Sequence, residues 1–149
     1  MIIITPKIID DTLAQLAFHA RGRKELVVLW LARKVAGQAI VERVYVPLQV
    51  SDTSFFNIPS EGMQLLFNEI RLSRLLVAAQ VHTHPKEAFH SHADDRWAVL
   101  RHVGALSLVL PYFARTTTSA NFADQAKVYA LSQHDEWDEI PFTQGITIQ

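Results

Sequence analysis

Four of the chain's seven histidines and two adjacent aspartates lie in residues 81–95, directly behind an apolar run. In an extended segment, residues i and i+2 point to the same face, so His82 and His84 are expected to grip one ion together. Pro85 cannot continue a ladder of hydrogen bonds, so a strand should end there. The pattern predicts a strand end that carries two metal ligands, followed by a loop that returns with a third.

The chemistry of these side chains suits zinc. The chain has no cysteine, so any zinc site must use imidazole and carboxylate groups. Two histidines and one carboxylate from the next helix leave a fourth tetrahedral position for water, which is typical of a hydrolytic site. Zinc would lower the pKa of that water to roughly 7, and a general base must still move its proton. A glutamate is the usual base, but spacing alone does not say which one.

Ser91 and Asp94 stand in S-x-x-D relation at the start of an expected helix. The plain interpretation is a capping box, in which each side chain bonds the other residue's backbone N–H. Capping is compatible with a catalytic role, because it fixes the helix start and aims a carboxylate at the strand end. A serine hydroxyl there would also be placed to donate to a developing oxyanion, a contact that can be worth ~10²–10³ in rate.

Bulk composition excludes several classes of protein. A chain of 149 residues with 49% apolar and 19% charged residues predicts one globular domain, 1–149. A net charge of −1 gives no long-range attraction to nucleic acid or to an anionic membrane. The apolar runs are shorter than the ~20 residues of a membrane span, and the absence of cysteine fits a reducing compartment. We therefore expect a soluble cytoplasmic protein.

Hydrophobic periodicity predicts strands that alternate with helices. Strands are expected at residues 2–5, 26–32, 39–49, 75–81, 105–110, 127–132 and 145–149. Helices are expected at 10–21, from Ser60 onward and from about Ser91 to His102, with a surface loop at 114–124. The alternation lacks strict βαβ regularity, which favours an α/β (α+β) fold with a mixed sheet flanked by about three helices.

The segments His82-Thr83-His84-Pro85 and Ser91-His92-Ala93-Asp94 resemble the signature of the JAMM (MPN-plus, JAB-domain) metalloproteases. That signature is an upstream Glu, then H-[ST]-H-P, then S-x-x-D. The resemblance implies a cytidine-deaminase-like sheet and zinc isopeptidase activity on the C-terminal tails of ubiquitin-like proteins. The short chain is similar to compact prokaryotic members, some of which belong to bacterial ubiquitin-like antiphage operons.

Carried over residue by residue, the resemblance makes His82, His84 and Asp94 the zinc ligands. It makes Ser91 the residue that assists the tetrahedral intermediate. It places the catalytic glutamate where the first helix gives way to the first central strand, and Glu25 occupies that place.

Two departures from the family pattern leave alternatives. The loop before Ser91 is one residue short, so the commoner spacing would make Asp95 the third ligand, with His92 in the serine's place. We prefer Asp94, because it keeps the serine and because a loop sheds a residue more easily than a helix changes register. Glu25 also lacks the glycine that often follows the family's glutamate. The other candidate bases, which surface charge explains more simply, are Glu42, Glu61 and Glu69.

The leading hypothesis is a zinc-dependent isopeptidase whose substrate is a ubiquitin-like protein or its conjugate. The alternative is a non-catalytic zinc-binding scaffold that docks a ubiquitin-like or other protein. A homo-oligomer is compatible with either hypothesis. Scaffold relatives typically lose motif residues, whereas this chain keeps them, which favours an enzyme. Phe89, an aromatic residue in a polar loop, is a candidate substrate contact.

Overall fold

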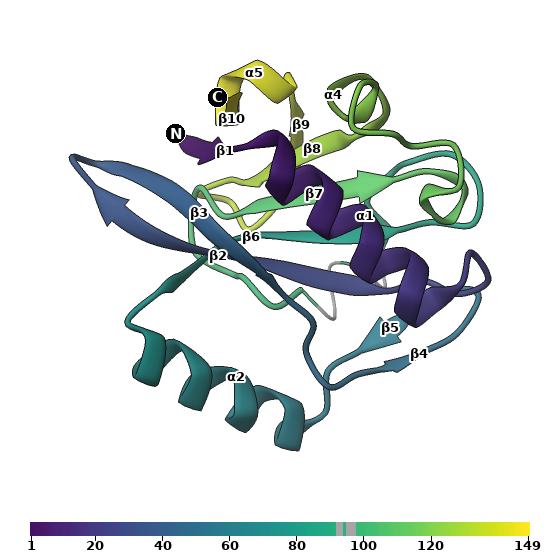
Figure 1. Ribbon diagram of the computed structural model, residues 1–149, viewed down its shortest axis with the longest axis horizontal. Coiled ribbons are helices and arrows are strands. Elements are labelled where there is room, and N and C mark those ends of the chain that lie inside the picture. The colour runs from purple at the N-terminus through teal and green to yellow at the C-terminus, as the bar shows by residue number, and fades with distance from the viewer. Residues whose placement is uncertain (92–93, 95–97) are drawn as a thin grey trace.

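A curled, mixed sheet of eight strands runs through the molecule (Figure 1). The computed structural model describes residues 1–91, 94 and 98–149. In spatial order the strands are β10 (Ile146–Ile148), β1 (Ile2–Ile4), β3 (Gln38–Tyr45), β2 (Val27–Val35), β6 (Leu76–Thr83), β7 (Leu106–Leu110), β8 (Lys127–Leu131) and β9 (Trp137–Ile140). The strand β1 is parallel to both neighbours and β6 is parallel to β7, while the other pairs are antiparallel. The fold is therefore α+β with a mixed sheet, as the alternation of elements predicts.

Two long helices cover opposite faces of this sheet. Helix α1 (Pro6–Ala20) packs on one face and α2 (Ser60–Ser73) on the other, as their separate apolar clusters show. The described residues also form α4 (Phe122–Gln125), α5 (Phe142–Gly145), a 3₁₀ turn η1 (Tyr112–Ala114) and a hairpin of β4 (Val50–Ser51) and β5 (Phe56–Asn57).

The strand β2 is the centre of the core. Its alternate side chains Val28 and Trp30 join the cluster under α1, and Val27 and Leu29 join the cluster under α2. A strand buried on both faces reads as a continuous apolar run, so the prediction from that run is confirmed. The indole N–H of Trp30 donates to Thr12 Oγ1 on α1 at 2.9 Å, which satisfies its polar atom inside the core.

Helix α1 begins four residues earlier than the apolar spacing predicts. Thr5 is its N-cap and accepts a hydrogen bond from the N–H of Ile8 at 3.3 Å, while Pro6 takes the first helical position. Both residue types favour a helix start, so the cap sets the boundary. At the other end Arg21 adopts the left-handed conformation and Gly22 follows with φ +67°, as a glycine stop predicts.

The prediction that a third helix extends to His102 is wrong for the described residues of that segment. Residues 98–102 are not helical, and 92–93 and 95–97 lie outside the described residues. The segment instead packs against the sheet: the N–H of Val99 donates to the buried Gln80 Oε1 at 2.8 Å, and Leu100 joins an apolar cluster with Leu131. Tertiary contacts override helical spacing here.

The other differences concern short elements. The expected strand 39–49 ends at Tyr45, and the expected loop 114–124 contains the start of α4, whose Phe122 is fully buried. Helix α5 and the strands β4, β5 and β9 have too few residues for a periodic pattern to show. No helix of the described residues has the length and apolar character needed to cross a membrane.

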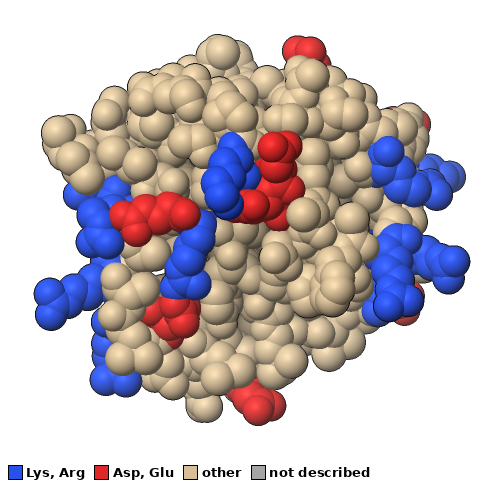
Figure 2. Space-filling model, viewed as in Figure 1, with Lys and Arg blue, Asp and Glu red and all other residues tan. Residues whose placement is uncertain are grey.

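Charged side chains on the face shown in Figure 2 lie in separate groups. Acidic side chains lie beside several of the basic ones on this face. Ion pairs of the described residues include Arg33–Glu42 and Arg43–Glu69. The described residues of this face therefore present no continuous stripe of one sign.

Candidate metal centre

The end of β6 carries His82 and His84. His82 lies between Val27 of β2 and Val109 of β7 in the sheet register. The backbone N–H of His84 donates to the Leu110 carbonyl at 2.9 Å, so the strand remains fixed one residue beyond its last regular pair. Both side chains are buried, and their ring centroids are 5.4 Å apart. The two imidazoles share one face, as their i, i+2 spacing predicts.

Asp94 brings its carboxylate to both rings. Its Oδ2 lies 3.1 Å from His82 Nε2 and 2.9 Å from His84 Nε2, and the residue is 2% exposed. Burial alone would raise the pKa of this carboxyl, but the contacts with the two histidines and with the Ser91 N–H outweigh burial and hold its pKa well below the usual range. Asp94 is therefore ionised at neutral pH, as a metal ligand must be.

These three side chains fit a metal ion. One ligand atom from each lies within 4.8 Å of the other two. A tetrahedral ion with bonds of 2.0–2.1 Å would hold its ligand atoms roughly 3.3 Å apart, close to the observed contacts. Both ring nitrogens of His82 are buried; Nδ1 has no hydrogen-bond partner among the described residues, and the 3.1 Å contact of Nε2 with Asp94 Oδ2 lacks the geometry of a hydrogen bond. A buried, unsatisfied ring nitrogen is costly, and a bound cation would satisfy the Nε2 that faces Asp94.

Ser91 and Asp94 make the two reciprocal hydrogen bonds of a capping box. The N–H of Ser91 donates to Asp94 Oδ2 at 2.7 Å, and the N–H of Asp94 donates to Ser91 Oγ at 3.1 Å. The cap thus holds in place the same oxygen that faces both histidines. Of the alternative assignment, His92 and Asp95 lie outside the described residues.

Glu25 lies just before β2 and is only 4% exposed. Burial raises the pKa of its carboxyl to about 7; nearby His84 lowers it and the Asp94 charge raises it further. Its side chain lines a hollow of about 280 Å³ together with His84 and Ser91. A carboxyl that titrates near neutrality beside a candidate metal site is suited to proton transfer.

The other glutamates considered as bases lie elsewhere. Glu42 pairs with Arg33 and Glu69 pairs with Arg43, both partly exposed to solvent, while Glu61 is an exposed residue in the first turn of α2.

The remaining walls of the hollow come from two loops. Phe89 places its ring edge-on against His84, with centroids 4.5 Å apart, and is 53% exposed. Ser54, in the turn between β4 and β5, also lines the hollow. No signal in the sequence singles out Ser54, because an isolated serine in a loop has no distinctive spacing.

A buried His-His-Asp group next to a buried carboxyl defines the class of protein as a candidate metallohydrolase. No family model matches the chain. Over 131 residues the chain is 34% identical to the probable metalloprotease y4jG of Sinorhizobium fredii (strain NBRC 101917 / NGR234). The matched region covers 83% of this chain and 79% of that protein. The chain belongs to the family of that probable metalloprotease.

A solved structure shares the fold. The solution structure of protein DSY2949 from Desulfitobacterium hafniense matches all of this chain and 93% of its own length, with a TM-score of 0.71 and 20% identity. At that identity the likeness concerns the fold alone.

Proposed function

We propose that the chain is a zinc-dependent peptidase of the JAMM type, with a cytidine-deaminase-like sheet, that removes or processes the C-terminal tail of a ubiquitin-like protein. The observation that carries the proposal is that Glu25, His84 and Ser91 line a single hollow. His82 and Asp94 lie in contact with His84 at that point. Residues far apart in the sequence thus supply a base, a hydroxyl and a metal-binding group to one place.

His82, His84 and Asp94 would hold the ion. Two neutral nitrogen donors and one carboxylate suit zinc and leave a coordination position free. When bound, zinc supplies Lewis-acid activation of water near neutral pH and polarisation of a carbonyl group.

Glu25 is the general base of the proposed reaction. Its carboxyl accepts a proton from the attacking water and passes it to the leaving amine, which requires a pKa that is not far from neutrality. Burial provides this tuning, since the pKa of Glu25 is about 7 in the absence of a metal. A cation at the adjacent site would favour the ionised form, which is the form that accepts the proton.

Ser91 supplies a hydrogen bond to the developing oxyanion. Its Oγ already accepts a bond from the N–H of Asp94, and the hydroxyl still has its own proton to donate. Because the capping box fixes Ser91, the donor is held in place before the substrate arrives.

The substrate proposal rests on shape and on the resemblance of the motif. The hollow beside Glu25 is small, about 280 Å³, and the short β4–β5 hairpin lies next to it. An extended tail could add to such a hairpin as a further strand, a common mode of peptide recognition. We also propose a cytoplasmic location and a role in a bacterial ubiquitin-like conjugation or antiphage operon; the lack of cysteine fits the location.

Cleavage of a reporter fused to the tail of a ubiquitin-fold carrier protein tests this function. The zinc-loaded protein should release the reporter, and a chelator should stop the release. Glu25→Gln should lower the rate by about 10²–10⁴-fold while zinc content stays the same. The matched exposed variant Glu61→Gln should cleave normally. Full zinc occupancy without cleavage of any fusion in a panel of ubiquitin-fold carriers would instead favour the non-catalytic scaffold.

A further inference from the structure

The backbone around Glu25 lies beyond the end of the pairing between β2 and β3. The pairing of β3 with β2 ends at Tyr45, which lies opposite Leu29. Val27, two residues earlier in β2, therefore has no β3 residue beside it. On the side away from β6, backbone groups left without partners at this position would be held by no ladder, and only the pairing with β6 would fix the segment.

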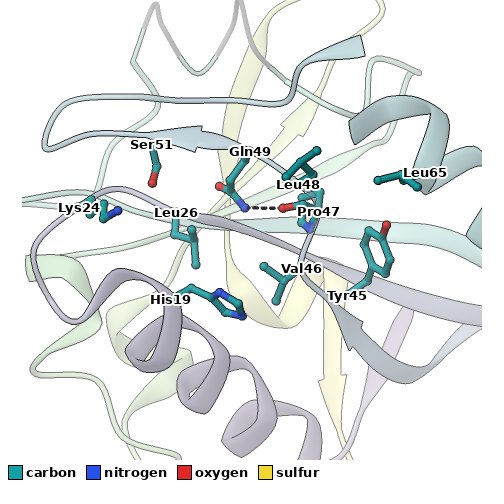
Figure 3. Close-up of a pocket in the computed structure, with 10 residues that line it drawn as sticks. All are labelled: His19, Lys24, Leu26, Tyr45, Val46, Pro47, Leu48, Gln49, Ser51 and Leu65. Atoms are coloured by element: carbon teal, nitrogen blue, oxygen red, sulfur yellow. Dashed lines mark hydrogen bonds between the residues drawn. The ribbon is translucent and has the colours of Figure 1, made fainter. Parts of the chain in front are cut away.

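The side chain of Gln49 takes the place of the missing strand. Its Oε1 accepts a hydrogen bond from the Val27 N–H at 2.9 Å, and its Nε2 donates to the Val27 carbonyl at 2.9 Å. The Nε2 also donates to the Pro47 carbonyl at 3.1 Å, the bond drawn as a dashed line in Figure 3. A side-chain amide has one acceptor and two donors, and all three groups are used here.

Thr83 fastens the same segment from the opposite side. Its Oγ1 accepts a hydrogen bond from the Leu26 N–H at 3.2 Å, and its own N–H donates to the Leu26 carbonyl at 3.2 Å. Thr83 is buried and stands between His82 and His84 in the sequence. The bond therefore ties the segment that carries the base directly to the strand that carries the two imidazoles.

Glu25 itself is bonded to the loop that carries Gln49. Its N–H donates to the Asp52 carbonyl at 2.8 Å. Residues 25 and 27 thus face the segment 47–52, and residue 26 faces β6. The alternation is that of a strand, but two of the bonding groups are side chains.

We propose that Gln49 and Thr83 are positioning residues that hold Glu25 in register with the candidate metal ligands. The inference rests on the proposed function of Glu25 as the base. A displacement of about 1 Å can cost about 10²-fold in rate, so the hydrogen bonds of Gln49 and Thr83 act on turnover more than on binding. The hydrogen bonds given above for the side chains of Gln49 and Thr83 go to the backbone of residues 26, 27 and 47 and not to the metal ligands.

We call the hydrogen bonds of Gln49 and Thr83 to residues 26 and 27 the clamp. The surroundings of Gln49 make the clamp testable by hydrogen exchange of backbone amides. Gln49 lines a separate, open hollow of about 510 Å³ together with Lys24 and Leu26 (Figure 3). Removal of the amide is therefore expected to expose the backbone of β2 to water from this hollow. Loss of the two bonds to Val27 should raise exchange at its N–H by roughly tenfold.

The experiment compares Gln49→Met with Gln64→Met, a matched change at an exposed position of α2. A second pair, Thr83→Val and Thr83→Ser, removes and retains the hydroxyl. Four quantities are measured in the full-length chain: exchange at the amides of residues 25–27, affinity for zinc alone, and kcat and KM for the reporter fusion.

The clamp predicts that Gln49→Met raises exchange at Val27 and also at Glu25, whose N–H bonds Asp52 and not Gln49. It predicts a kcat lowered by about 10²-fold, KM within about threefold and unchanged zinc affinity. Thr83→Val should act in the same way, and Thr83→Ser should restore the rate.

Two results would overturn the clamp: exchange confined to Val27, or a kcat that is unchanged while the amides exchange faster. Thr83→Val with wild-type kcat would overturn the part assigned to Thr83. Wild-type protein that binds zinc and cleaves no fusion would be a failure of the proposed function. That failure is distinguishable from failure of the clamp, because amide exchange in Gln49→Met shows whether Gln49 holds Glu25 in place even when no fusion is cleaved.

Discussion

Glu25 and Asp94 are two buried carboxyls with opposite pKa shifts. Burial raises the pKa of the Glu25 carboxyl to about 7. Asp94 is as deeply buried, but the two imidazoles and the Ser91 N–H keep its pKa low. Two carboxyl groups whose environments push their pKa values apart can take different roles in one site. Here Glu25 is suited to carry a proton, and Asp94 stays an anion.

The raised pKa of Glu25 predicts a pH-dependent cost in the metal-free protein. Between pH 4.5 and about 7 the folded state keeps a proton on Glu25 that the unfolded chain has lost, so stability falls as pH rises through this window. Glu25→Gln removes the cost. Chelator-treated Glu25→Gln should match wild type near pH 4 and become more stable by on the order of 2–3 kcal/mol above pH 7.

Urea unfolding across pH 4 to 8 checks this prediction. Glu61→Gln serves as the matched control, since the carboxylate of Glu61 is exposed to solvent. A stability difference for Glu25→Gln that stays flat over the whole range would contradict the burial of an uncompensated carboxyl at residue 25.

The choice between Asp94 and Asp95 as third ligand is also decided at single residues. Asp94 Oδ2 lies against both histidines, so Asp94→Asn should weaken zinc binding by at least about 10²-fold. Asp95→Asn should leave affinity unchanged. Isothermal titration with zinc measures both; the reverse order of effects would transfer the ligand role to Asp95.

At the scale of elements, a capping box does the work of aiming a ligand. Ser91 and Asp94 satisfy each other's N–H groups, and the same Asp94 oxygen faces the end of β6. The hydrogen bonds that join Ser91 to Asp94 and the geometry of the site are therefore one structural feature.

Ser91→Ala separates its two effects. Loss of the cap should cost about 0.5–2 kcal/mol in unfolding free energy, and loss of the hydroxyl should lower kcat by about 10²–10³-fold. Ser91→Thr keeps a capping hydroxyl and should retain most of both. Denaturant unfolding and steady-state kinetics give the two numbers. A normal kcat in Ser91→Ala would leave the residue as a cap alone.

Helix α2 presses closely on the loop that leads to Gln49. A Cβ added to Gly62 would meet the Leu48 carbonyl oxygen and would lie 2.9 Å from Ile58 Cγ2. Gly62→Ala should therefore destabilise the protein by about 1–3 kcal/mol, against the usual gain of alanine in a helix. Asn68→Ala, at an exposed position of α2, is the control and should be neutral or slightly stabilising. A stabilised Gly62→Ala would show that the loop can move away without cost.

The long elements were predictable from the sequence because periodicity and burial agree in them. The runs that became β2, β6 and β7 are mainly apolar where both of their faces are covered: residues 27–32 without interruption, and residues 76–81 and 106–110 with Gln80 and Ser107 as their polar members. The short β4, β5 and β9 were not predictable, because two to four residues give no period. Residues 98–102 show helical spacing but bond the sheet through Gln80, a contact that only the folded chain reveals.

At the scale of the whole molecule, the candidate site is an intersection of three parts of the chain. The fold brings Glu25 from before β2, the histidines from the end of β6, and Ser91 with Asp94 from the following loop. The local motif at residues 82–94 was visible in the sequence, and the resemblance to a family pattern pointed to Glu25. The sequence did not predict that Ser54, Gln49 and Asp52 lie around Glu25, because no short-range pattern encodes a contact between segments more than twenty residues apart.

The central claim is that this intersection binds one zinc ion. Crystals grown with zinc and measured above and below the zinc absorption edge test it directly. The account predicts one anomalous peak, about 2.0–2.1 Å from His82 Nε2 and His84 Nε2 and about 2.0–2.2 Å from an Asp94 oxygen. Metal-replete crystals with no peak there, or with a peak bound by other side chains, would contradict it.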